Sequence, residues 1–259
     1  MEIVIADDAT RCGSILANLI TDAIEAGAAT LGLATGSSPL LAYQELARRH
    51  REEGLSFAGL QAFLLDEYVG LPPTHRQSYA RVIRTEFVDH VDLDPGRVYS
   101  PDGMADDITA AATAYDAHIA AAGPVDVQIL GIGANGHIGF NEPTSSLRSR
   151  TRVKTLTEQT RRDNARFFDS IDEVPQHVIT QGLGTICDAR HLALIATGPH
   201  KAAAIAAAAE GPLSASCPAS VLQLHPHVTV IVDAAAAGQL KNSEFYRYVH
   251  DHKPDPQKY

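Results

Sequence analysis

The chain has 259 residues, which suits one large domain or two small ones and is ample for a buried core. Apolar residues make up 45% and charged residues 20%, as in an ordinary globular protein. The formal net charge of -10 argues against non-specific nucleic-acid binding, which needs a basic surface. A small anionic ligand is compatible with this charge if local cations or backbone N–H groups receive it.

The cysteines and the first residues indicate the compartment. Cys12, Cys187 and Cys217 are scattered and form no C-x-x-C pair, so neither a disulfide framework nor a zinc cluster is indicated. The opening MEIVIADDAT predicts a strand followed by acids, without the basic and long apolar parts of a secretion signal. No apolar stretch is long enough to span a membrane. We therefore expect a cytoplasmic protein with no membrane partner.

Short apolar runs alternate with longer helical patterns along the chain. This alternation predicts an α/β fold, an open and mostly parallel sheet with helices on both faces, doubly wound and Rossmann-like, in a single domain. We place that domain at 1–250 and a polar tail at 251–259. We expect strands at 1–6, 30–36, 60–68, 125–133, 191–198 and 227–233, and helices at 14–27, 38–54, 107–123, 174–189 and 199–211.

Polar clusters follow four of these strands. In open parallel sheets, ligands bind outside the carboxyl ends of the strands, so clusters at four such ends predict one shared site. No single cluster would support that prediction as well. The clusters lie at 35–38, 66–67, 135–142 and 197–201.

Two of the clusters are typical of anion sites at the start of a helix. In LATGSSP, Ser37 or Ser38 can cap a helix that has Pro39 at its first position. The free N–H groups and the helix dipole would attract an anion, but the P-loop lysine is missing, so a nucleoside triphosphate is not indicated. In TGPHK, Lys201 lies in the first turn, where a cation is unfavourable unless a bound anion offsets it. An ordinary capped turn and a solvated lysine are the alternatives.

The other two clusters carry acids and an imidazole. Asp66 follows a buried strand, where burial could tune it as a general base, although a solvated turn or helix cap is the alternative. The loop GIGANGHIGFNEP has the glycine spacing of a dinucleotide site, but no helical pattern follows it, so we reject that interpretation. Glu142 precedes Pro143 and should be extended, with its side chain directed away from the loop. Together with Asn135 and His137, it is typical of proton-transfer machinery.

The remaining histidines and the basic residues are less informative. The chain has twelve histidines but no H-E-x-x-H or comparable spacing, and the HPH at 225–227 is more typical of a turn. We therefore expect no metal. The stretch 145–168 is the most basic part of the chain. It is either a solvated face or a source of phosphate ligands, and its spacing does not say which.

Together, these motifs resemble the glucosamine-6-phosphate deaminase family. The resemblance covers most of the chain in order, and its second and third motifs are specific. The related 6-phosphogluconolactonases share the fold and a similar glycine loop without the Phe-Asn-Glu-Pro continuation seen at 140–143. The motifs are LATGSSP, LLDEYVGLP, GIGANGHIGFNEP, SRTRVKTLT, DNARFF, TGPHKA and LQLHPH.

The resemblance implies that glucosamine 6-phosphate and water give fructose 6-phosphate and ammonia, with no cofactor. By motif match, His137 serves ring opening with Glu142 paired to it, and Asp66 moves a proton between C2 and C1 through an enolamine. Asn135 stands where some members have aspartate, and it can orient His137 by hydrogen bonding. The substrate and its phosphate would be held by Thr35, Gly36, Ser37, Ser38, Gly136, Arg166 and Lys201.

The resemblance also bears on assembly and regulation. Some family members are hexamers activated by N-acetylglucosamine 6-phosphate, and Ser145, Arg152 and Lys154 match positions of their regulatory anion site. The tail around Tyr246 and Tyr248 gives no secure counterpart of that site's tyrosine. We expect a homo-oligomer and leave its regulation open. Two rival functions are a sugar-lactone phosphate hydrolase, which would not release ammonia, and a sugar-phosphate sensor that binds without turnover.

Overall fold

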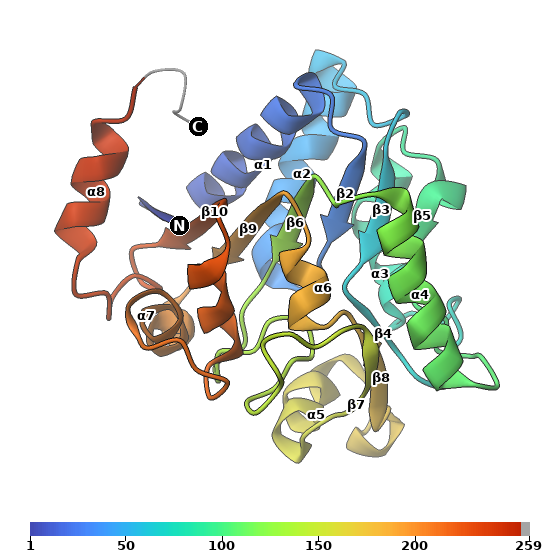
Figure 1. Cartoon of the computed structure of the whole chain (residues 1–259). Helices are drawn as coiled ribbons and strands as arrows, with labels where there is room; N and C mark the ends of the chain where they lie inside the picture. The colour runs from blue at the N-terminus through green and yellow to red at the C-terminus, as the bar shows by residue number, and fades with distance from the viewer. Residues whose placement is uncertain (255–259) are drawn as a thin grey trace.

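The computed structural model describes residues 1–254, apart from the side chain of Asp163, and its central element is a seven-stranded sheet (Figure 1). The strand order is β1-β10-β9-β6-β2-β3-β5, and each neighbouring pair is parallel. The predicted open, parallel sheet is thereby confirmed. Its strands are β1 (Glu2–Ala6), β2 (Thr30–Leu33), β3 (Gln61–Leu64), β5 (Val98–Tyr99), β6 (Val127–Leu130), β9 (His191–Ala196) and β10 (Val228–Asp233).

Helices cover the sheet on both faces, with α1 and α2 packed together behind it and α6 and α7 in front of it in Figure 1. Local capping explains where some of them begin and end. Asp8 accepts a hydrogen bond from the first turn of α1, and Gly54, at φ 78°, ends α2 in the left-handed conformation. The helices are α1 (Ala9–Glu25), α2 (Ser37–Glu53), α3 (Tyr79–Glu86), α4 (Ile108–Ala122), α5 (Glu158–Asn164), α6 (Leu183–Cys187), α7 (Ala202–Glu210) and α8 (Ser243–Asp251).

A second, three-stranded antiparallel sheet corrects two of the predicted elements. It consists of β4 (Asp66–Tyr68), β8 (His177–Thr180) and β7 (Arg152–Thr155) in the order β4-β8-β7. The expected single strand at 60–68 is therefore two strands in different sheets. The expected helix at 174–189 is wrong for its first half, because the β-branched residues before Gly182 form β8 and only α6 is helical.

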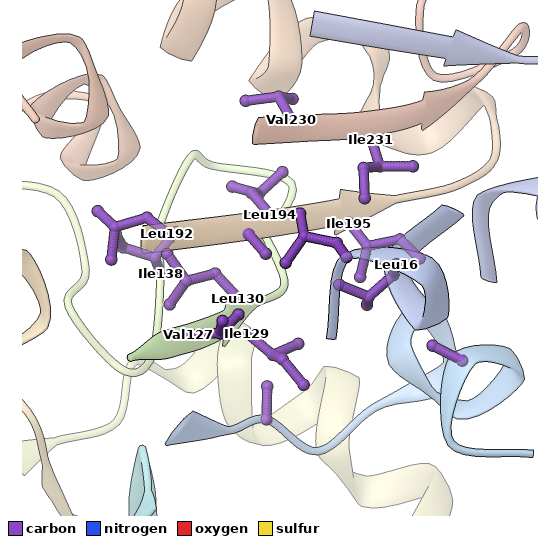
Figure 2. Packing of buried hydrophobic residues seen from close by; sticks show 14 of the residues in the cluster. Leu16, Val127, Ile129, Leu130, Ile138, Leu192, Leu194, Ile195, Val230 and Ile231 are labelled. Atoms are coloured by element: carbon purple, nitrogen blue, oxygen red, sulfur yellow. The ribbon is translucent and has the colours of Figure 1, made fainter. Parts of the chain in front are cut away.

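Two hydrophobic clusters hold the chain together, and one loop belongs to both. The main cluster fills the space between the large sheet and its helices, and Figure 2 shows Ile138 of the loop after β6 among the side chains of β6 and β9. A smaller cluster, which we call the satellite core, contains Tyr68, Phe140, Leu156, Phe168, Val174 and Val178. Ile138 is fully buried in the main core and Phe140 nearly so in the satellite core, so alternate residues fix the loop from two sides.

The C-terminal part of the chain lies beside the first strand. Helix α8 contacts β1, and the Lys253 ammonium lies 2.7 Å from a Glu2 carboxylate oxygen. The predicted polar tail at 251–259 overlaps the end of α8, and residues 255–259 lie outside the described part of the chain. Within residues 1–254, no helix combines the length and apolar character that crossing a membrane requires.

Candidate functional site

The four polar clusters follow four strands that are consecutive neighbours in the sheet, β3-β2-β6-β9. Since these strands are parallel, their carboxyl ends lie along one edge. The strand order also reverses between β2 and β6, which is the place where open α/β sheets form a binding crevice. The small sheet and α5 lie below this edge in Figure 1, with the loop after β6 between them. The predicted convergence of the four clusters is thus present in the fold.

The turn from β2 into α2 presents unoccupied donors. The expected cap by Ser37 or Ser38 is wrong, because Gly36 is the N-cap, no side chain caps the helix, and α2 begins at Ser37 with Pro39 inside its first turn. Gly36 has φ 113°, which L-residues rarely adopt, while the space around it is open. The first N–H groups of α2 therefore remain available to an anion, next to the exposed Ser37 and the half-buried Thr35 and Ser38.

Lys201 reaches from the end of β9 to the glycine loop. Gly198, at φ 88°, turns the chain into a short 3-10 helix, η5 (Pro199–Lys201), which continues into α7. The Lys201 ammonium donates to the backbone carbonyl of Ile132 at 2.6 Å. The structure therefore brings this cation to the loop that carries the acids and the imidazole, as the strand-end argument predicted.

The glycine loop after β6 is folded on itself and is not followed by a helix; the next regular element is β7. Gly136 and Gly139 have φ of 82° and 54°. The His137 ring covers Gly133 so closely that a methyl group there would lie 2.2 Å from it. The N–H of Gly136 donates to the carbonyl of Gly133, and the carbonyl of Gly136 accepts from the N–H of Ala219, so Gly136 forms the turn. The predicted contact of Gly136 with a substrate stays a prediction.

Asn135, His137 and Glu142 form one cluster in this loop. The Asn135 amide donates to Glu142 Oε2 at 2.6 Å, and His137 Nδ1 lies 3.6 Å from the same oxygen. The expectation that Glu142 points away from the loop is therefore wrong, because the loop turns back before Pro143. Asn135 is hydrogen-bonded to His137 as expected, since its oxygen accepts from the backbone N–H of His137 at 3.2 Å.

The charge on Glu142 is strongly favoured. Burial would raise the pKa of this carboxyl, but the neighbouring His137 ring, the Thr160 hydroxyl and the Asn135 amide lower it to about 2. His137 Nδ1 is buried and has no hydrogen-bond partner within the described part of the chain. The cluster therefore joins a stable carboxylate to the buried nitrogen of an imidazole, an arrangement suited to proton transfer.

Asp66 lies across from this cluster, at the first position of β4. Its carboxyl is 7% exposed, and a methyl group added at Gly139 would lie 3.5 Å from Asp66 Oδ2. Burial raises the pKa of Asp66 to about 8, with a smaller contribution from the charge of Glu67. Thr180, its partner in β8, receives the N–H of Phe140 on its hydroxyl at 3.1 Å, which fixes the loop beside the carboxyl.

Glu67 has a different role from its neighbour. Its carboxylate accepts from the backbone N–H groups of Tyr68, Tyr79 and Ala80 at 2.9 to 3.0 Å, the last two at the start of α3. Burial raises the pKa of Glu67, and these three hydrogen bonds oppose the shift. Glu67 thus supports the first turn of α3, whose N-cap is Ser78, which leaves Asp66 as the acid that faces the loop.

The basic stretch 145–168 divides into structural and unassigned residues. Arg150 pairs with Asp116 and Asp188, while Arg161 donates to the backbone carbonyls of Ile171 and Val174. Arg166 is exposed and its guanidinium lies 4.6 Å from the centre of the Phe167 ring. Its predicted role as a phosphate ligand stays a prediction.

The predicted regulatory residues lie around β7. The Ser145 hydroxyl is buried and has no hydrogen-bond partner within residues 1–254. Arg152 and Lys154 lie on β7, where Arg152 donates to the carbonyl of Arg150 at 3.2 Å and burial lowers the pKa of its guanidinium. Their part in regulation stays a prediction.

Sequence reasoning missed two hydroxyls of the site, those of Thr160 and Thr180. Both act across long sequence separations, Thr160 on Glu142 and Thr180 on Phe140. Neither has a motif of its own, so spacing could not have revealed them. Within residues 1–254, no group of three or more His, Cys, Asp or Glu side chains is arranged to hold a metal ion.

The chain belongs to the family described as glucosamine-6-phosphate isomerases/6-phosphogluconolactonase, whose model it matches over residues 6–231. Among curated proteins, it is 65% identical to a Glucosamine-6-phosphate deaminase of Rhodococcus opacus (strain B4), and all of both chains is covered. It is 62% identical to a protein of the same name from Corynebacterium kroppenstedtii, again over 100% of each chain.

Solved structures of the same family resemble this chain as well. One described as a monomeric glucosamine-6-phosphate deaminase is 42% identical, with a TM-score of 0.90 over 92% of this chain and 100% of that chain. The 6-phosphogluconolactonase of Trypanosoma brucei is 22% identical, with a TM-score of 0.74 over 92% of this chain and 98% of that chain, and so shares the fold.

Proposed function

We propose that this protein converts glucosamine 6-phosphate and water into fructose 6-phosphate and ammonia. The observation that carries the proposal is the position of the buried Asp66 carboxyl beside Gly139. Gly139 belongs to the loop in which His137 is paired with Glu142. Full-length identity to proteins named for this activity supports it.

Each residue of the site has a defined part in the proposed reaction. The N–H groups at the start of α2 hold the phosphate, together with Ser37, Ser38, Arg166 and Lys201. His137, paired with Glu142, transfers the proton that opens the sugar ring.

The Asp66 carboxylate then takes the proton from C2 and returns it to C1, while the C1 oxygen gains the proton that the C2 ammonium loses. This leaves an imine at C2, which water hydrolyses with release of ammonia. Because the pKa of Asp66 is raised to about 8 in the free protein, a substrate ammonium beside it would favour the carboxylate that the step needs.

Ammonia release from glucosamine 6-phosphate, measured for the purified protein and for Asp66→Asn, tests the proposal. The amide keeps the shape of the side chain but cannot accept the proton. We expect kcat to fall by about 10²-fold or more, as for loss of a general base. Equal rates would remove Asp66 from its role. Tight binding without ammonia would favour a sensor, and hydrolysis of a sugar-lactone phosphate would favour the lactonase alternative.

Compartment, assembly and regulation follow from the resemblance and stay predictions. The cytoplasm and a homo-oligomer are expected, although the solved relative at 42% identity is described as monomeric. Light scattering on the purified protein measures the assembly. Kinetics with and without N-acetylglucosamine 6-phosphate, repeated with Arg152→Gln, test the expected regulatory set of Ser145, Arg152 and Lys154.

A further inference from the structure

Helix α5 is joined to the catalytic cluster through a buried threonine. Thr160 is 7% exposed, and its hydroxyl donates to Glu142 Oε1. The Thr157 hydroxyl, which is the N-cap of α5, lies 2.8 Å from Thr160 Oγ1. A carboxylate can only accept, so the single proton of Thr160 is committed to Glu142 and Thr157 must donate to Thr160. The two hydroxyls therefore form a chain that ends on the catalytic carboxylate.

Thr160 completes the support of Glu142 from outside the loop. Asn135, in the loop itself, donates to Oε2, the oxygen that faces His137, whereas Thr160 holds Oε1. With a donor on each oxygen, the plane of the carboxylate is fixed. A carboxylate held on one oxygen could rotate about its last side-chain bond, and its distance to His137 would then vary.

The same face of α5 also contacts the strand of Asp66. Asn164, four residues after Thr160, donates to the Tyr68 hydroxyl at 2.9 Å, and Tyr68 ends β4. The 3-10 helix η3 (Ala165–Phe167), which carries Arg166, follows α5 directly. One short helix thus connects both acids of the site to the segment expected to hold the phosphate.

We propose that Thr160 is a positioning residue that orients the Glu142 carboxylate toward His137 and couples the placement of α5 to proton transfer. This inference rests on the function proposed above. It predicts that removal of the Thr160 hydroxyl slows the chemical step and leaves substrate affinity largely unchanged, because Thr160 contacts neither the start of α2 nor Lys201 of η5.

Steady-state ammonia release by Thr160→Val and Thr160→Ser tests the proposal. Valine has nearly the shape of threonine but no donor, so we expect kcat to fall about 10- to 100-fold, the effect of losing one hydrogen bond to a charged group, with KM within about threefold. Serine restores the hydroxyl and should restore kcat to within about threefold. Unchanged kcat in Thr160→Val, or no rescue by serine, would overturn the proposal.

Thr185→Val is the matched control. Thr185 is as buried as Thr160, and its hydroxyl donates to another carboxylate, Asp116 Oδ1, at 2.6 Å, away from the catalytic loop. This variant loses the same kind of bond but should keep kcat within about twofold of wild type. An equal loss of kcat in both variants would show a general structural effect and would also overturn the proposal.

A double-mutant cycle with Glu142→Ala shows whether Thr160 acts through Glu142. We expect Thr160→Val to slow the Glu142→Ala protein by less than about twofold, whereas independent effects would multiply. If wild type releases no ammonia, the proposed function fails, and the same four proteins are then compared by thermal unfolding. Non-additive shifts in Tm would preserve the Thr160–Glu142 coupling, and additive shifts would overturn it.

Discussion

In the main sheet, the carboxyl ends of the strands form one edge and their amino ends form the opposite edge. The two edges carry similar residues and differ in how these residues are bonded. At the carboxyl edge lie Asp66 and the His137–Glu142 pair. At the opposite edge, His191 begins β9, and His225 and His227 directly precede β10. Both edges are rich in titratable groups, and composition alone would not rank one above the other.

His191 and His225 at the amino edge are held by contacts within the fold. A ring nitrogen of His191 lies 2.9 Å from the Thr229 hydroxyl, and its ring stacks on His227 with centroids 3.6 Å apart. His225 Nε2 faces the carbonyl of Ala189 at 2.8 Å, while Nδ1 receives the His227 N–H at 3.1 Å. One neutral tautomer of His225 satisfies both contacts, so neither ring nitrogen of His225 is left for a ligand.

The carboxyl edge keeps capacity in reserve. His137 Nδ1 has no hydrogen-bond partner within residues 1–254, the start of α2 has no side-chain cap, and the pKa of Asp66 is displaced to about 8. The uncapped start of α2 and the displaced pKa of Asp66 distinguish this edge from the amino edge. Four changes, taken from the largest expected effect to the smallest, test this contrast.

Glu142→Gln should have the largest effect. The amide cannot carry the charge that pairs with His137, and its NH₂ group would meet the Asn135 donor, so we expect kcat to fall by about 10² to 10⁴-fold. His225→Gln at the opposite edge is the control and should keep kcat near the wild-type value. Ammonia release measures both, and a comparable loss in the two variants would contradict the contrast.

The pH profile of kcat/KM should show the raised pKa of Asp66. A base must be ionised to act, and its free-protein pKa is about 8, so activity should fall as pH drops through that value. Below it we expect about a tenfold loss per pH unit in kcat/KM, down to about pH 6. An inflection near pH 4, the ordinary range of a carboxyl, would contradict this assignment.

His191→Gln should change stability rather than rate. Burial, with smaller contributions from His227 and His225, lowers the pKa of His191 to about 3. As pH falls from about 6.5 toward 3, His191 binds a proton in the unfolded chain but not in the folded chain, so the free energy of unfolding decreases across this window. Glutamine does not titrate, and the decrease should become shallower. Urea unfolding at several pH values measures it, and an unchanged slope would exclude His191 as a contributor.

Two glycines give the smallest and best matched comparison. Gly36 and Gly27 have φ of 113° and 93°, and a methyl group on either would meet no atom within 4 Å. Replacement of each by alanine should cost about 1 kcal/mol of stability through backbone strain alone. Only Gly36→Ala, at the start of α2, should also raise KM. An equal rise of KM in both variants would remove the special role of this turn.

The contrast also shows what the sequence could and could not predict. The parallel sheet followed from the alternation of apolar runs and helical patterns, and the shared edge followed from the rule for strand ends. The small sheet was missed because β8 was included in a predicted helix, although its β-branched residues favour a strand. The side-chain direction of Glu142 and the contact from Thr160 depend on how distant segments meet, which local preference does not determine.

The position of Ile138 and Phe140 in separate cores has a consequence for heat inactivation. Both anchors lie between His137 and Glu142 in the sequence, and each is held by its own packing. The satellite core is far smaller than the main one and should melt first. Mild heating should therefore abolish the activity while the large sheet is still folded, and cooling should restore the activity.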